Sequence, residues 1–394
     1  MNPYFKFLFP LLCMTWLGVE ACQVPVFRYA LERWENDPYQ IYVLGDGELS
    51  GDAKEAFEFL RDLEVAEESP ANVYVEPVDL GKDKDAETFR NHFQEAKVGL
   101  PAIFMYYPDD RLGFPPIWAG KANMANARAV VDSKLRREIM GRILGGDSAV
   151  WVMVESGDRE LDDAAFGKMA GFLKKAEADL ELPEGVIQAA QAREALASGQ
   201  FIDQSNILES EIELKIKFSR LRMSRNAAGE GPFLKMLLTM EEDLGDFAGE
   251  PMFFPVFGRG RALEPLIGEG IDLDNVLDYS QYITGACSCE VKKQNPGIDL
   301  LTRMDWVAAL EGGTEFVIEK LLPPMEGVAL VLGQEEKSES GWEPISIGSV
   351  SQTAGVSTTG NDNPAGGETY NYWVVLLGGF VVVLLVGSLF SGRK

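Results

Sequence analysis

Apolar residues are densest at the two ends of the 394-residue chain and follow secondary-structure periods between them. At the N-terminus, Lys6 precedes an apolar run over 7–19, and the small residue Ala21 closes the segment. This layout is typical of a secretory signal peptide, and the run is too short to span a bilayer comfortably. We therefore predict a signal peptide over 1–21 and export of the body of the protein.

The C-terminal apolar run is long enough to cross a membrane. Residues 369–392 carry no charge, and 373–390 is nearly continuous Val, Leu, Gly and Phe. Aromatic residues at the start of this run, with Arg393 and Lys394 directly after it, predict one transmembrane helix and a cytoplasmic C-terminus. Residues 333–368 are rich in Ser, Gly, Thr, Asn and Glu, so we expect a flexible linker between the body and this anchor.

Between the two ends, stretches with period 2 alternate with stretches of period 3.6, which predicts strands alternating with helices. The predicted strands are 40–44, 73–80, 102–107, 117–120, 149–154, the alternating run 212–218, 252–256 and 263–267. The predicted helices are 26–34, 53–63, 86–96, 125–144, 162–178, 232–244 and 273–285. This alternation predicts an α/β fold in which helices pack over sheets.

The same order of elements occurs twice along the body. The pattern Gly-Asp-x-Glu-Leu stands between a strand and a helix at 45–49 and again at 157–161. A Gly-x-Pro-apolar pattern precedes a later strand at Pro101 and again at Pro251. The predicted organisation is a first domain over 22–146, a second domain over 147–298 with a helical insertion near 183–211, and a closing segment over 299–332.

The order of helix, Leu-Pro, buried strand, turn, strand and last helix resembles the thioredoxin fold without its first strand. That family has a cis-proline before the penultimate strand, where Pro101 and Pro251 stand in this chain. It also has a CxxC motif before the first core helix, whereas loop 45–51 contains no cysteine. The resemblance implies two tandem thioredoxin-like α/β/α domains without redox activity. It also implies peptide docking at the cis-proline loops, so Leu100, Pro101, Glu250 and Pro251 are the candidate binding residues.

Composition excludes several classes of function. The chain has 62 Asp and Glu against 36 Lys and Arg, and this net charge of −26 argues against nucleic acid, whose phosphates need a basic surface. The single histidine, His92, removes most triads and zinc sites, and we expect it at a surface or half-buried helix position. No spacing isolates an acid–base pair of carboxylates, so we expect no catalytic residue and no cofactor. The acidic tandem body is also similar to the calsequestrins, whose acidic tail this chain lacks.

The cysteines carry an alternative hypothesis. Removal of the signal peptide would leave Cys22, Cys287 and Cys289. Cleavage before Cys22 resembles processing at a bacterial lipoprotein box, although Glu20 stands where a small uncharged residue is usual, so Cys22 is a candidate for lipidation. The Cys287-Ser288-Cys289 sequence is open to three interpretations. These are a structural pair or a disulfide to Cys22, a readily reduced strained disulfide, and a soft-metal site.

Together these patterns predict a single-pass protein of the cytoplasmic membrane with an extracytoplasmic, periplasmic body. We expect it to bind a protein partner, itself membrane-associated, and not to be an enzyme. The alternative is a thiol-redox or soft-metal transfer protein that uses Cys22 with Cys287 and Cys289.

Overall fold

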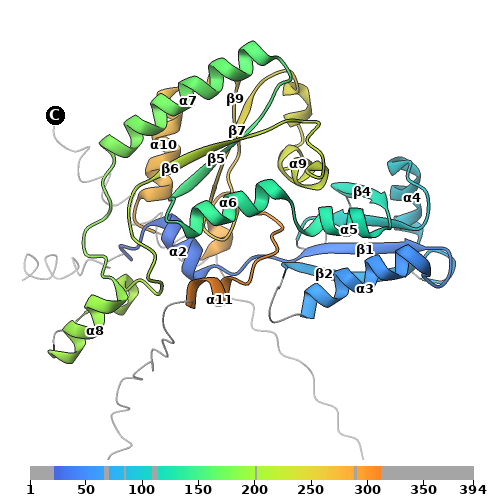
Figure 1. Cartoon of the computed structure of the whole chain (residues 1–394), viewed down its shortest axis with the longest axis horizontal. Coiled ribbons are helices and arrows are strands. Elements are labelled where there is room, and N and C mark those ends of the chain that lie inside the picture. The colour runs from blue at the N-terminus through green and yellow to red at the C-terminus, as the bar shows by residue number, and fades with distance from the viewer. Residues whose placement is uncertain are drawn as a thin grey trace, which may run out of the picture. The chain divides into compact units, whose positions relative to one another are not determined.

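The structure is a computed structural model that describes residues 22–65, 71–83, 86–108, 114–199, 202–287 and 291–311. The predicted signal peptide, linker and transmembrane helix, Cys289 and most of the closing segment lie outside these ranges. The described chain is a mixed α/β structure with two sheets, which confirms the α/β part of the predicted fold class (Figure 1). Within these ranges no helix is both long enough and apolar enough to cross a membrane.

The first sheet has the strand order β2-β1-β3-β4. Its strands are β1 (Tyr39–Gly45), β2 (Val73–Asp79), β3 (Ala102–Tyr106) and β4 (Trp118–Lys121). Strand β1 pairs with β2 in parallel and with β3 antiparallel, and β3 pairs with β4 antiparallel. Successive side chains of β1 are buried on opposite faces: Ile41 and Val43 on one, Tyr42 and Leu44 on the other. Helices α3 (Gly51–Val65) and α5 (Met124–Val131) cover the first face, and α4 (Ala86–Ala96) covers the second.

The second sheet repeats this arrangement and has the order β10-β8-β7-β5-β6, with β9 paired to β7. Its strands are β5 (Ala149–Val154), β6 (Phe218–Met223), β7 (Met252–Phe257), β8 (Arg261–Ala262), β9 (Leu266–Ile267) and β10 (Ile298–Asp299). Strand β5 is parallel to β6 and antiparallel to β7. Helices α7 (Arg159–Asp179) and α10 (Leu273–Thr284) pack on the face that carries Trp151, while α6 (Lys134–Leu144) and α9 (Gly231–Leu238) pack on the face of Val150 and Val152.

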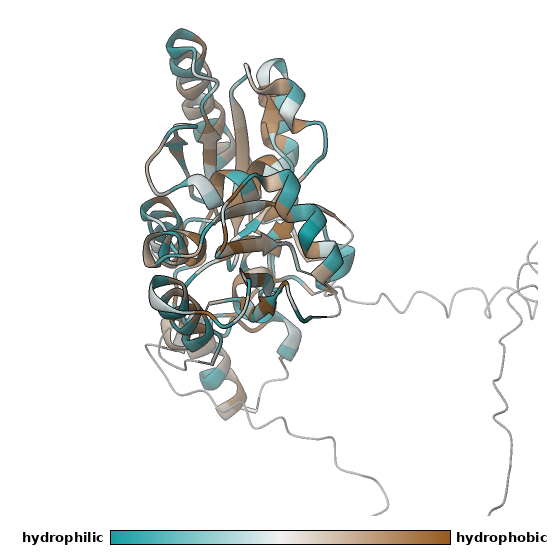
Figure 2. Ribbon diagram, turned by 90° about the vertical axis from the view of Figure 1, so that its right-hand side faces the viewer, coloured by the Kyte–Doolittle hydropathy of each residue, from teal (hydrophilic) through white to brown (hydrophobic). Residues whose placement is uncertain are grey.

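One hydrophobic core joins the two sheets. It combines Ile41 and Val43 of β1 with Val150 and Val152 of β5, and helices of both units contribute to it. Leu301, from the closing segment, is fully buried in the same core. The apolar strands lie in the interior, and the helices that cover them carry hydrophilic residues (Figure 2). The hydrophobic effect therefore stabilises both sheets together.

The N-terminal helix α2 (Val26–Arg33) packs against the second sheet, beside α10 (Figure 1). The Val26 amide donates to the Gly285 carbonyl at 3.0 Å. The facing turn is able to approach because Gly258 has φ +57°, and a Cβ there would lie 2.6 Å from the Ala30 Cβ. Only glycine fits such a left-handed, closely packed position.

The remaining elements connect or close these units. They are the insertion helix α8 (Ala189–Ala197), the terminal helix α11 (Trp306–Glu311), and the 3₁₀ helices η2 (Gln204–Asn206), η3 (Leu244–Phe247), η4 (Gly268–Gly270) and η5 (Lys292–Gln294). Helix α8 and η2 lie within the predicted helix-plus-loop insertion near 183–211.

Several predicted elements differ from the structure. The expected helix 125–144 is two helices, because Ser133 caps α6 by accepting a hydrogen bond from the Arg136 amide at 3.2 Å. The expected strand 212–218 was wrong: the strand begins at Phe218. The carbonyls before it are bonded to groups outside any ladder, such as the Ile212 oxygen to Arg28 and the Lys215 oxygen to the Ser148 hydroxyl.

Two further expectations need a smaller correction. The helix expected over 232–244 ends at Leu238, and the 3₁₀ helix η3 follows separately. The strand expected over 263–267 is present only as β9, Leu266–Ile267, and the short β8 before this range also pairs with β7. The last strand, β10, was not predicted, because two residues are too few to show a period.

Candidate functional site

The Leu100-Pro101 loop lies where the first sheet meets the cysteine-free loop after β1. Leu44 pairs with Ala102, so Pro101 stands opposite Gly45, the last residue of β1. The Leu100–Pro101 peptide bond is cis, as the resemblance implied. Pro101 is half-buried and its carbonyl accepts a hydrogen bond from the Ala122 amide at 2.8 Å. Leu100 is 36% exposed, so this edge presents an apolar side chain to solvent.

The corresponding Glu250-Pro251 loop is different. Among the described residues the cis geometry occurs at Leu100–Pro101 alone, so the bond before Pro251 is trans and the expected second cis-proline was wrong. The chain enters β7 from η3, whose Phe247 carbonyl accepts from the Glu250 amide at 2.9 Å. Pro251 is buried, and its carbonyl accepts a hydrogen bond from the Gly268 amide. Glu250 is exposed, so this loop offers a charge in place of an apolar contact.

The loop after β1 lines a cavity of about 600 Å³, and the described residues around it include no Cys, Ser or Thr. Asp79, at the end of β2, holds this loop by accepting hydrogen bonds from the Gly47 and Gly81 amides at 3.1 and 2.9 Å. The Gly81 bond, and then Lys82 at 3.1 Å, keep the pKa of the Asp79 carboxyl below its usual range. The Asp79 carboxylate is therefore occupied in shaping the loop.

The two Gly-Asp-x-Glu-Leu segments are not structurally equivalent. In the second, Asp158 caps α7 by accepting hydrogen bonds from the Glu160 and Leu161 amides. The buried Asp162 also accepts from the Ser156 amide at 2.8 Å. In the first segment Gly45 still belongs to β1, and α3 begins only at Gly51. The repeated pattern thus reflects turn and cap chemistry and marks no shared ligand site.

Cys22 and Cys287 lie in one buried cluster and are 6% and 1% exposed. The Cys287 amide donates to the Val24 carbonyl at 3.0 Å, and the Cys22 thiol lies 3.3 Å from the Ser205 carbonyl oxygen. Cys289 lies outside the described residues. In the part of the chain that the structure describes, no three His, Cys, Asp or Glu side chains are arranged to hold a metal. Lipidation and redox use of these cysteines stay predictions.

His92 is buried, which corrects the expected surface or half-buried position. Its Nδ1 lies 2.9 Å from the Tyr106 hydroxyl, in the small core beneath α4. Burial lowers the pKa of His92 below its ordinary value, and nearby Glu95 partly opposes this shift. Burial likewise raises the pKa of Tyr106. Because His92 is buried and bonded to Tyr106, the pair is a contact within the core.

No protein-family model matches this chain, and no curated protein matches it in sequence. The candidate site therefore depends on the geometry of the chain itself.

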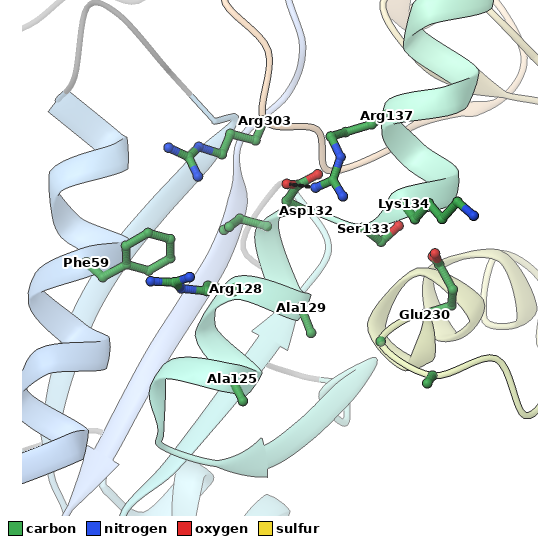
Figure 3. Close-up of a pocket in the computed structure, with 13 residues that line it drawn as sticks. Phe59, Ala125, Arg128, Ala129, Asp132, Ser133, Lys134, Arg137, Glu230 and Arg303 are labelled. Atoms are coloured by element: carbon green, nitrogen blue, oxygen red, sulfur yellow. Dashed lines mark hydrogen bonds and ion pairs between the residues drawn. The ribbon is translucent and has the colours of Figure 1, made fainter.

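One group of functional candidates was missed by the sequence analysis. Between Lys121 and Arg142 there are six basic and two acidic residues, a local reversal of the overall charge. Part of this segment lines a cavity of about 560 Å³ (Figure 3). Its walls contain Arg128, Lys134, Arg137 and Arg303. The local charge reversal was a usable signal, but Arg303 is distant in sequence and could not have been added to it.

Proposed function

We propose that this chain is a membrane-anchored extracytoplasmic binding protein built from two thioredoxin-like units without a redox dithiol. The predicted signal peptide over 1–21 and the predicted anchor over 369–392 support this location. A protein segment of a membrane-associated partner docks beside Leu100. The membrane anchor keeps the body close to such partners.

The topology of both sheets supports the thioredoxin-like part of the proposal. In each unit the first strand pairs in parallel with the second and antiparallel with the third, and the third pairs antiparallel with the fourth. In each unit the first and last helices, α3 with α5 and α7 with α10, share one face. The middle helix, α4 or α9, covers the other face.

The observation that carries the binding role is the exposed Leu100 beside a loop that lacks cysteine. In the thioredoxin family, the surface next to the cis-proline is where peptide substrates dock. Here Leu100 is an exposed apolar side chain, and the loop after β1, which follows the residue opposite Pro101, lines a groove without a cysteine. Because Pro251 is buried, docking is assigned to the first unit.

Site-specific photocrosslinking tests this proposal. A photoreactive phenylalanine analogue replaces Leu100 in the full chain, and cells are irradiated before the membranes are isolated. The matched control carries the analogue at Leu196, which is 50% exposed on the insertion helix α8. We expect a discrete membrane-protein adduct from position 100 that Leu196 does not give. Equal labelling from both positions, or no adduct from position 100, would contradict the proposal.

The thiol-redox or soft-metal alternative is favoured by one observation, the shared cluster of Cys22 and Cys287. Burial opposes it, because reactive thiols are usually exposed in electropositive surroundings. Thiol trapping with mass spectrometry across a redox titration distinguishes the two functions. If every cysteine keeps one state and no metal co-purifies, the alternative fails and the binding role stands.

A further inference from the structure

We infer that the cavity between α3, α5, α6 and the turn before α9 binds a small oxyanion that also carries a hydrogen-bond donor. The cavity has a volume of about 560 Å³, within the range of small-molecule sites. It is distinct from the candidate docking site at Leu100 and from the cluster that contains Cys22 and Cys287. The inference does not depend on the proposed docking function.

The first argument is unpaired positive charge. Of the two carboxylates in the wall, Asp132 forms an ion pair with Arg137. The other, Glu230, accepts a hydrogen bond from the Leu135 amide at 3.0 Å through Oε1. No described side chain forms an ion pair with the remaining cations, Arg128, Lys134 and Arg303. Three uncompensated cations around one cavity, in a chain of net charge −26, favour an anionic ligand.

The second argument is the position of two guanidinium groups. Those of Arg128 and Arg303 lie 5.9 and 5.8 Å from the centroid of the same ring, Phe59 (Figure 3). Cation–π contact with one ring keeps both guanidinium groups near Phe59 and restricts both side chains. An oxyanion that reaches both groups would be bound by two cations. Guanidinium is the side-chain group best suited to bind carboxylate or phosphate through two parallel hydrogen bonds.

The third argument is that the backbone beneath both arginines is fixed. The buried Arg136 donates to the Ala129 and Val130 carbonyls at the end of α5, and to the Leu301 carbonyl at 3.0 Å. Arg303, two residues after Leu301, forms an isolated bridge with Ala71. The elements that carry Arg128 and Arg303 are thus joined, which lowers the entropy cost of ordering a site on ligand binding.

The opposite wall specifies the donor on the ligand. Glu230 is only 7% exposed, and its Oε2 has no hydrogen-bond partner among the described residues. A buried carboxylate oxygen without a donor is costly, so a ligand hydroxyl or ammonium group would satisfy it. The large net negative charge disfavours polyanions such as nucleic acid, which leaves a small organic acid or phosphate monoester.

Calorimetric titration of the full chain in detergent tests the inference, at constant ionic strength in chloride. The probes are inorganic phosphate, citrate and O-phosphoethanolamine, which adds an ammonium donor to a phosphate. We expect saturable binding of phosphate or citrate, and the tighter of the two identifies the oxyanion class. Arg128→Gln and Arg303→Gln should each weaken binding about tenfold or more, which is about 1.4 kcal/mol. Arg61→Gln is the matched control. Arg61 is also on α3, the helix of Phe59, but its guanidinium lies over the ring of Phe57.

The donor part has its own readout. O-phosphoethanolamine should bind more tightly than inorganic phosphate, and Glu230→Gln should remove this difference while its Oε1 still accepts from Leu135. Thermal unfolding confirms that each variant is folded. If neither oxyanion saturates by about 10 mM, or if the Arg128 and Arg303 variants bind like the wild type, the inference is overturned. Equal affinity for the two phosphates would overturn the donor assignment.

Discussion

Arg136 donates a hydrogen bond to the Leu301 carbonyl across 3.0 Å and so joins α6 to a segment 165 residues later in the chain. The same guanidinium also bonds to the last carbonyls of α5. It has no carboxylate partner among the described residues, and burial lowers its pKa to about 10. Arg136 therefore joins α5, α6 and the segment at Leu301 through hydrogen bonds to uncharged backbone carbonyls. Burying its charge among them carries a substantial desolvation cost.

We expect Arg136→Met to lower the free energy of unfolding by about 3 kcal/mol, because it leaves several buried carbonyls without a donor. The neighbouring variant Arg137→Met is the matched control. Arg137 is exposed and pairs with Asp132, so its loss should cost less than about 1 kcal/mol. Urea denaturation of both variants measures the difference, and equal effects would show that the hydrogen bonds of Arg136 are unimportant.

A second prediction concerns the ion pair inside α2. The Arg28 and Glu32 side chains are 2.7 Å apart and essentially inaccessible to solvent, and Glu32 also accepts from the Ser210 amide. Arg28→Met leaves a buried carboxylate without its cation, so we expect a loss of about 3–5 kcal/mol. Amide exchange at Ser210 should rise in this variant, because Arg28 no longer donates to the Ser210 and Ile212 carbonyls, and Glu32 alone then ties the insertion to α2.

A double-mutant cycle separates pairing from packing. In Arg28→Met/Glu32→Gln both charges are gone, so we expect about 1–3 kcal/mol of the loss to be recovered. The control cycle uses Lys54 and Glu58, an exposed pair at 3.9 Å, for which the coupling should stay below about 0.5 kcal/mol. A coupling at Arg28–Glu32 as small as in this control would refute the prediction.

The single histidine gives a clean pH prediction. The pKa of His92 is lowered in the folded protein by burial, so at mildly acidic pH the unfolded chain binds more protons than the folded chain. Stability should therefore fall as the pH drops below about 6.5, the ordinary histidine pKa, towards the folded value. His92→Gln should be less stable at pH 7.5 but flatter over pH 7.5–5.5. Denaturation at several pH values checks this, and parallel curves for the two proteins would contradict it.

The two Gly-Asp-x-Glu-Leu segments predict unequal effects of the same substitution. Asp158→Ala removes the cap of α7 and should cost about 0.5–2 kcal/mol. Asp46→Ala, at the same position of the first segment, lies five residues before the start of α3 and should change stability by less than about 0.5 kcal/mol. Thermal unfolding compares the two, and a larger loss for Asp46→Ala would reverse the assignment.

The sequence patterns correctly predicted those helices and strands whose hydrogen bonds are local or whose side chains are uniformly buried. The apolar strand 149–154 and the helix 86–96 have the expected bounds for this reason. The alternating run 212–218 misled because its carbonyls bond to Arg28 and to Ser148, and tertiary contacts of this kind leave no local signal. His92 was misplaced for the same reason, since its partner Tyr106 lies on a different element.

The candidate site was predictable only in part. The position of Pro101 directly before β3 followed from the order of elements, and the structure agrees. The trans bond and burial at Pro251 did not follow, because they depend on how η3 enters the strand. The association of Phe59, Arg128 and Arg303 is a product of three separate segments. No spacing in one sequence reveals it.

The docking of α2 on the second sheet has a consequence for biogenesis. The Val26 amide of α2 donates a hydrogen bond to the Gly285 carbonyl. Because synthesis proceeds from the N-terminus, α2 is complete long before Gly285 is added to the chain. The apolar face of α2, which includes Phe27 and Ala30, therefore lacks its native partner while the intervening chain is synthesised. A nascent chain interrupted before α10 would expose that face, which makes truncated products natural clients for chaperones.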